Sequence, residues 1–188
     1  MIRNEAIDLL ARRDLAKLSP EGRETLLLDW WHIDIASPEY DELPDLLRAE
    51  IKRSDYPNDP KSERYNPLLL IALHRSYKGV LNSYLRQQIA MIGRDESVHG
   101  DPELLTACPC CGYRSLSERG GYEICCVCFW EDDGTIDADC VSGPNHMTLR
   151  DARLNILRFG AVTEGDRQHV LPDGRERYAL DPVRSHAS

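Results

Sequence analysis

Cysteine is absent from the first 107 residues of this chain, and no long apolar run occurs anywhere in its 188 residues. All seven cysteines fall between Cys108 and Cys140. In a cytosolic protein, such clustering indicates metal binding rather than disulfide bonds. The longest uncharged apolar run, Leu68 to Leu73, is far too short to cross a bilayer, and the charged start Met1 to Glu5 lacks the apolar segment of a signal peptide. We therefore predict a cytoplasmic protein with no membrane partner.

Positive charge is also scarce, because 23 Lys and Arg residues face 32 Asp and Glu residues and leave a net charge of -9. A nucleic-acid binder needs basic side chains that displace counterions from phosphates, and neither half of this chain is basic. The composition thus argues against a nucleic-acid partner and favours a protein partner with a basic or mixed surface. The hydrophobic fraction of 41% is sufficient for a core.

Helical periodicity of apolar residues dominates the first half of the chain. Ser19-Pro20 and Ser37-Pro38 are start signals, because Ser caps a helix and Pro suits its first turn. Gly79 interrupts the longest periodic segment, where we expect a kink or close packing. The predicted helices cover residues 2–18, 20–34, 38–55 and 66–92.

The helical pattern stops at Gly100-Asp101-Pro102, after which cysteines, glycines and short alternating stretches follow. Thr148 can cap one further helix, which Gly160 would end. Pro172-Asp173-Gly174 is a turn signal that allows a loose hairpin in the tail. The predicted domains are a helical domain (1–105), a metal module with a trailing helix (106–162) and a C-terminal tail (163–188).

Two CxxC pairs form the most specific motif in the chain. Cys108-Pro109-Cys110-Cys111-Gly112 has the form of a zinc knuckle, and Cys125-Cys126-Val127-Cys128 supplies a second pair. The residues between the pairs have room for a strand (113–116), a turn at Gly120-Gly121 and a returning strand (122–124). This arrangement predicts a zinc ribbon. The predicted fold is mainly α, with a helical N-terminal region followed by a small β zinc ribbon and a C-terminal helix.

The predicted ligands of Zn²⁺ are Cys108, Cys111, Cys125 and Cys128. Four thiolates close the tetrahedral coordination shell, as in structural zinc sites, whereas catalytic zinc keeps one position for water. Cys110 and Cys126 lie inside their knuckles, where a ligand pair of adjacent residues would have poor geometry. A swap in which Cys140 or His146 replaces one knuckle thiolate stays open at this point.

Aromatic and acidic residues follow the second knuckle directly, and they allow two interpretations that can both hold. In the first, Phe129 and Trp130 seal a ribbon too small for its own core, and the acids are merely solvated. In the second, an aromatic anchor with an acidic rim binds a basic partner, since aromatic centres and charged edges are common at interfaces. The candidate partner-binding residues are Trp130, Glu131, Asp132 and Asp133.

The cysteine region resembles a known family over about residues 106–162. The resemblance rests on CPCCGYRSLSERGGYEICCVCFWEDDG and its continuation through GPNHMTLRDARLNILRFGA, which are similar to the bacterial cysteine-rich CPCC family. The family reads Cys-Pro-x-Cys at the second knuckle, where this chain has Cys126 in place of Pro. The resemblance implies a zinc-binding module, and such modules turn up near bacterial toxin systems.

Three functional hypotheses follow. The first is a non-catalytic protein-binding protein, most concretely a bacterial immunity protein or antitoxin that covers the active site of a cytoplasmic toxin with a basic cleft. The second is an enzyme, either a hydrolase or one that uses a thiol such as Cys110. The third is a nucleic-acid-associated zinc-ribbon regulator, which the charge disfavours. Because residues 1–105 contain no dinucleotide fingerprint, P-loop, HExxH motif or nucleophile elbow, we assign no catalytic residues.

Overall fold

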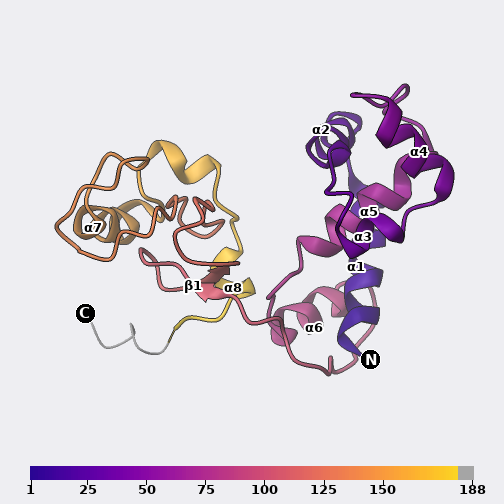
Figure 1. The fold of residues 1–188 in the computed structure, drawn as a ribbon. Helices are drawn as coiled ribbons and strands as arrows, with labels where there is room; N and C mark the ends of the chain where they lie inside the picture. Colours follow the sequence, from indigo (N-terminus) through magenta and orange to yellow (C-terminus); the bar gives the residue numbers. More distant parts are fainter. Residues whose placement is uncertain (182–188) are drawn as a thin grey trace. The chain divides into compact units, whose positions relative to one another are not determined.

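The computed structural model describes residues 1–181, and the chain divides into two compact units. The first, called here the helical unit, comprises Met1–Lys78 and Leu85–Gly100. The second, called the cysteine unit, comprises Gly79–Tyr84 and the chain from Asp101 onward. Figure 1 shows that helices make up most of the first, while loops and a few short elements make up the second.

Two helices of the helical unit begin at the serine caps that the sequence predicts. The Ser19 hydroxyl accepts a hydrogen bond of 3.0 Å from the Gly22 amide, and the Ser37 hydroxyl accepts one of 3.3 Å from the Tyr40 amide. The elements are α1 (Arg3–Lys17), α2 (Pro20–Trp31), α3 (Pro38–Asp41), α4 (Asp45–Arg53), the 3-10 turn η1 (Glu63–Tyr65), α5 (Asn66–Arg75) and α6 (Asn82–Ala90). The first three residues of α6 belong to the cysteine unit.

A continuous apolar core holds the helical unit together. Helix α5 packs against both α1 and α2. The Trp31 ring meets the Tyr65 ring edge to face at 5.5 Å between centroids, and its indole N–H donates to the Ser54 carbonyl at 2.8 Å. One buried cluster of this core consists of Leu27, Trp31, Tyr40, Leu43, Leu47, Tyr65, Leu68 and Leu69.

Two of the predicted helices are interrupted. The third is split because Pro44, which has no N–H to donate, lies between α3 and α4. The longest is split between α5 and α6, where Gly79 has a φ of +70°. A Cβ at Gly79 would lie 2.4 Å from the Leu105 side chain, so this position needs glycine for both its backbone conformation and its space. The expected kink is therefore a complete break.

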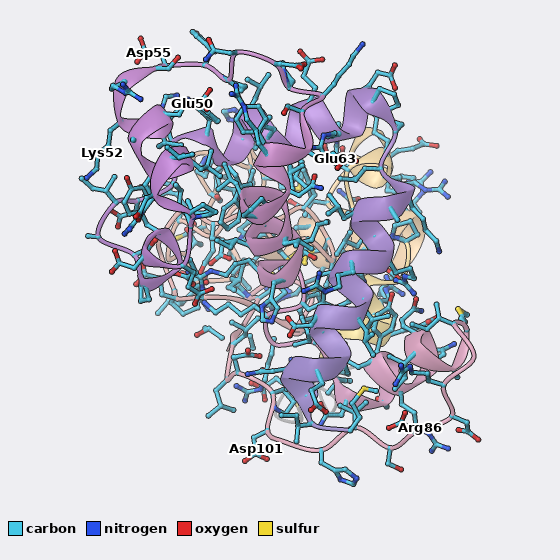
Figure 2. All side chains as sticks on the ribbon, turned by 90° about the vertical axis from the view of Figure 1, so that its right-hand side faces the viewer. Glu50, Lys52, Asp55, Glu63, Arg86 and Asp101 are labelled. Carbon is cyan, nitrogen blue, oxygen red and sulfur yellow. The ribbon has the colours of Figure 1, made fainter. Side chains whose placement is uncertain are left out.

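Charged side chains of both signs cover the helical unit, and some acids are tied to neighbours. Figure 2 shows Lys52 projecting from the last turn of α4 and Asp55 from the loop that follows it. Glu50, on the same helix, accepts hydrogen bonds from the Arg64 guanidinium at 3.0 Å and the Tyr65 hydroxyl at 2.7 Å. Within residues 1–181, no helix combines the length and the apolar character needed to span a bilayer.

The cysteine unit contains little regular structure. Strands β1 (Thr106–Ala107) and β2 (Arg114–Leu116) form an antiparallel pair. Helix α7 (Leu149–Phe159) begins at the cap Thr148 and ends at Gly160, which has a φ of +83°. The 3-10 turn η2 (Gly165–Gln168) and the short helix α8 (Gly174–Arg177) follow. The predicted fold class, mainly α with a small β element and a C-terminal helix, is confirmed.

The tail has α8 in place of the predicted hairpin. Residues 172–174 lead into this helix, and the segment after it pairs with the first knuckle. The Arg114 amide donates to the Ala179 carbonyl at 2.8 Å, and the Asp181 amide donates to the Gly112 carbonyl at 3.0 Å. The tail is thus joined to the cysteine region up to Asp181, and residues 182–188 of the predicted tail lie outside the described residues.

Candidate metal centre

The two knuckles share one backbone pattern. In the first, the Cys108 amide donates to the Tyr113 carbonyl at 2.8 Å, and the Gly112 amide donates to the Cys108 carbonyl at 3.0 Å. In the second, the corresponding bonds run from the Cys125 amide to the Trp130 carbonyl at 2.8 Å and from the Phe129 amide to the Cys125 carbonyl at 2.7 Å. Each CxxC pair therefore folds as its own small turn.

The fifth residue of each knuckle has a left-handed backbone. Gly112 has a φ of +82°, and Phe129, at the equivalent place, has a φ of +70°. A bulky residue pays a steric cost in this region that glycine avoids. The Phe129 ring stacks on the His169 ring with centroids 5.1 Å apart, which is a packing gain at the same position.

The predicted ribbon pairing is not observed. We expected strand 113–116 to pair with a returning strand at 122–124, but β2 pairs with β1 instead. Ile124 forms an isolated antiparallel bridge with Glu131, on the far side of the second knuckle. The partners are local because each knuckle brings its own flanking residues together, so the two ends of the connection between the knuckles pair with β1 and with Glu131 instead of with each other.

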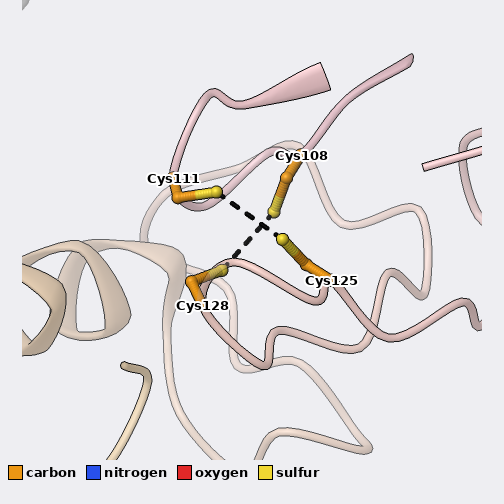
Figure 3. Close-up of side chains that lie close together, drawn as sticks. All are labelled: Cys108, Cys111, Cys125 and Cys128. Atoms are coloured by element: carbon orange, nitrogen blue, oxygen red, sulfur yellow. Dashed lines mark hydrogen bonds between the residues drawn. The ribbon is translucent and has the colours of Figure 1, made fainter. Parts of the chain in front are cut away.

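The four predicted ligands come together. Their sulfur atoms all lie within 4.8 Å of one another. The Cys108 and Cys128 sulfurs are 3.7 Å apart, and those of Cys111 and Cys125 are 3.6 Å apart, along the two crossing lines of Figure 3. A tetrahedron with metal–sulfur bonds of about 2.3 Å has edges of about 3.8 Å, so this spacing fits a ZnS₄ site. A disulfide would require about 2.0 Å.

Hydrogen-bond donors surround the sulfur cluster. The Cys108 sulfur accepts from the Cys110 amide, and the Cys125 sulfur accepts from the Val127 amide, both at 3.4 Å. The Ser115 hydroxyl lies 3.1 Å from the Cys125 sulfur. Cys108, Cys125 and Cys128 have exposures of 0%. Cys111 is partly exposed. Donors of this kind stabilise thiolate charge and orient metal ligands.

The thiols of the cluster oppose one another's ionisation when no cation is bound. Hydrogen bonds from Cys108, Cys111 and Cys128 lower the pKa of Cys125 well below its ordinary value. Hydrogen bonding to Cys108 raises the pKa of Cys111, and the thiols around Cys128 raise its pKa in the same way. One thiolate in the cluster thus keeps its neighbours protonated. A divalent cation removes this conflict because it stabilises all four thiolates together.

The other candidate ligands lie outside the tetrahedron. Among residues 1–181, the group of His, Cys, Asp and Glu residues close enough to share a metal ion consists of the four predicted cysteines. The Cys110 thiol is buried and interacts with Cys128, but it is not part of that group. Burial, followed by the charge of Cys125, raises the pKa of Cys126 to about 11. Cys140 is exposed and contacts Asp137 at 3.5 Å. His146, which was left open as a ligand, is likewise not in the group.

The structure buries two of the four candidate partner-binding residues. Trp130 and Asp132 both have an exposure of 0%. The Asp132 carboxylate accepts from the Arg119 guanidinium at 2.7 Å and from the Gly120 amide at 2.9 Å, so it anchors the loop between the knuckles. Trp130 therefore has the sealing position of the first interpretation. Asp132 is an internal anchor, which neither interpretation anticipated.

The remaining two residues, Glu131 and Asp133, are partly exposed. The Asn145 side chain clasps the Glu131 backbone, donating to its carbonyl at 2.8 Å and accepting from its amide at 2.9 Å. The buried Ser142 hydroxyl donates to Asp133 at 2.8 Å. Burial would raise the pKa of Asp133, but hydrogen bonds from Ser142 and Thr135 outweigh it and lower the pKa. No periodicity or spacing in the sequence indicates Asn145, Ser142 or Arg119 as supports of this segment.

Backbone bonds also join the region after α7 to the second knuckle. The Val162 amide donates to the Cys128 carbonyl at 2.9 Å, and the Leu171 amide donates to the Cys126 carbonyl at 2.8 Å. The structural unit around the metal centre thus continues past residue 162. Comparison with curated proteins and with solved structures finds no match. Residues 106–176, which contain the entire metal centre, match the family model described as Cysteine-rich CPCC, and the chain is similar to that family over this region.

Proposed function

We propose that the cysteine unit is a structural zinc module and that the chain as a whole is a non-catalytic, protein-binding protein. The observation that carries the proposal is the set of four sulfurs at the spacing of a ZnS₄ tetrahedron. Four sulfur ligands in this geometry suit zinc or iron rather than calcium or magnesium. A metal with four protein ligands has no position left for a reacting water, which supports a structural role.

The metal proposal is tested by elemental analysis of the purified full chain. We expect about one zinc per chain, and we expect Co²⁺ exchanged into the protein to show the absorption of a tetrahedral thiolate complex. The Cys128→Ser variant should lose the metal, and the matched variant Cys140→Ser, at an exposed cysteine, should keep it. A folded wild-type protein without metal, or one that holds iron, contradicts the assignment.

The proposed partner is a cytoplasmic bacterial toxin with a basic cleft, whose active site the chain covers as an immunity protein or antitoxin. Two features support this choice: the net charge of -9 and the accessible acids Glu131 and Asp133 beside the second knuckle. Complementary charge steers association, so binding should be faster at low salt. Trp130 and Asp132 would contribute from the inside, by holding this acidic segment in place.

Expression of each gene adjacent to this one, with and without the chain, tests the partner proposal. We expect one adjacent gene to arrest growth of a host cell and the chain to restore it. The double variant Glu131→Gln, Asp133→Asn should slow association with that toxin and weaken its salt dependence. Glu21→Gln, Glu24→Gln, which removes the same charge from exposed sites in α2, is the control. The immunity proposal fails if none of the adjacent genes encodes a toxic protein that binds this chain. That outcome would leave the metal proposal unaffected.

A further inference from the structure

A groove of about 480 Å³ lies on the cysteine unit, and neither the metal centre nor the acidic segment accounts for it. Its walls come from the second knuckle, the end of α7 and the segment before α8. Most of the lining residues are apolar, among them Val127, Leu157, Val170 and Pro172. Leu157 is 85% exposed. An exposed apolar side chain at the edge of an apolar groove is typical of a protein-binding surface.

The charge of the groove is opposite to that of the chain. Arg167 and Arg175 line it, both are exposed, and the lining contains no carboxylate. Neither guanidinium has an ion-pair partner among residues 1–181. The net charge of the whole chain is nevertheless -9. A basic edge on an apolar groove therefore selects an occupant that is apolar and acidic. A basic segment would be repelled by the two arginines, and a purely polar segment would leave the apolar side chains of the groove without a packing partner.

We propose that this groove binds a segment of another protein that combines apolar side chains with carboxylates. The apolar side chains pack against Leu157 and Val170, and the carboxylates pair with Arg167 and Arg175. Arginine suits this role because its planar guanidinium can bind a carboxylate through two hydrogen bonds. The surface has the opposite charge preference to the acidic segment at Glu131 and Asp133, so it is a second interaction site that does not depend on the immunity proposal.

The groove is built on the metal centre. Val127 lies between Cys126 and Cys128 in the chain, and the amide of Leu171, another lining residue, donates to the Cys126 carbonyl at 2.8 Å. A Cβ at Gly174 would lie 3.3 Å from the Val127 side chain, so the start of α8 packs closely on the knuckle. Removal of the metal should therefore disassemble the groove. This dependence, unlike the groove itself, rests on the proposed zinc site.

Fluorescence anisotropy with two labelled peptides tests the proposal on the full zinc-loaded chain. One peptide consists of leucine and glutamate, and its matched counterpart has lysine in place of every glutamate. We expect the leucine–glutamate peptide to bind and the leucine–lysine peptide not to bind. Leu157→Glu should weaken binding by about tenfold or more, as expected for an anchor residue. Leu154→Glu is the matched control, since Leu154 is 60% exposed on the same helix but outside the groove.

The charge requirement has its own pair of variants. Arg175→Glu should weaken binding of the leucine–glutamate peptide and strengthen binding of the leucine–lysine peptide. Lys61→Glu, the same charge change at an exposed site in the helical unit, should change neither. Zinc content and the melting curve of each variant show whether it is folded. Equal binding of the two peptides, no binding at millimolar peptide, or equal loss in Leu154→Glu and Leu157→Glu overturns the proposal. Binding that survives removal of the metal overturns the dependence of the groove on the metal centre and leaves the groove itself.

Discussion

The helical unit and the cysteine unit reach a compact structure by different means. The helical unit has long helices and a continuous apolar cluster around Trp31, Tyr65 and Leu68. Up to Asp181, the cysteine unit has strands of two and three residues and one helix longer than a single turn, α7. Its buried side chains include Trp130, Leu149 and the cysteines Cys108, Cys110, Cys125 and Cys128. Elements this short bury little apolar surface, so small modules need additional cross-links such as a metal.

The two units also differ in the polar side chains that hold their loops. The cysteine unit ties its loops with side chains that bind backbone groups, such as Asp132 to the Gly120 amide and Asn145 to the Glu131 backbone. The helical unit has such contacts too, for example from Arg23 to the Ser62 carbonyl, but it also has the apolar cluster around Trp31. The comparison teaches that the two units should respond in opposite ways to loss of metal and to loss of apolar volume.

The largest expected effect is the removal of metal from the cysteine unit. Chelation, or Cys125→Ser, should unfold this unit, because structural zinc contributes about 10 to 16 kcal/mol to the folding of small zinc domains. The helices α1 to α5 should remain. Far-UV circular dichroism and limited proteolysis of the full chain measure the two effects separately. Loss of the entire helical signal would show that the helical unit depends on the metal as well.

The converse experiment is Trp31→Ala in the helical unit. This change removes a side chain with 1% exposure, its contact with Tyr65 and its hydrogen bond to Ser54. We expect a loss of about 3 to 5 kcal/mol in the free energy of unfolding of the helical unit, with zinc content unchanged. Leu46→Ala, at a site with 86% exposure, should change it by less than about 0.5 kcal/mol. Release of zinc from Trp31→Ala would mean that the units do not behave separately.

Asp132→Ala tests the polar anchors. The change removes the acceptor of the Gly120 amide and the ion-pair partner of Arg119, whose guanidinium keeps its bond to the Thr135 carbonyl. Hydrogen bonds to a charged group contribute about 1.5 to 3 kcal/mol each in favourable cases. We expect a total loss of about 2 to 3 kcal/mol, read from the temperature at which zinc is released. Asp137→Ala, at an exposed acid nearby, should leave this temperature unchanged.

The smallest expected effect is a loss of stability at alkaline pH through Tyr84 in the cysteine unit. Burial, with a hydrogen bond to Asp173, raises the pKa of Tyr84 from 10.0 to about 12. The folded state thus favours the neutral phenol, so its contribution is complete below pH 10 and is lost as the pH rises through 12. The full shift corresponds to about 2.7 kcal/mol, and solvent screening reduces the expected contribution to about 1 to 2 kcal/mol.

Denaturant unfolding of wild type and Tyr84→Phe, at pH values below 10 and near 12, measures this contribution. The decline in stability over that interval should be smaller in the variant, which has no phenol to ionise. Other groups that titrate in the interval, such as Cys126, act in both proteins and cancel in the difference. An identical decline in the two proteins would remove the role assigned to Tyr84.

The metal ligands and several helix starts follow from the sequence because both depend on short spacings. A CxxC pair places two sulfurs on one turn whatever surrounds it, and Ser19-Pro20 and Ser37-Pro38 place a cap and a compatible first residue side by side. Pro44 shows that periodicity alone can mislead even at short range. The apolar period continues from α3 into α4, but Pro44 has no N–H to donate, so the predicted helix is divided there.

Features that join distant residues follow only from the tertiary structure. The break at Gly79 depends on the Leu105 side chain, the burial of Asp132 depends on Arg119, and the groove depends on α7 and on the segment bonded to Cys126. The sequence by itself determined the four sulfur ligands and the helical character of the N-terminal region, since local spacing and periodicity encode them. The accessibility of the acidic segment and the groove were settled by folding, because burial depends on which remote side chains cover a residue.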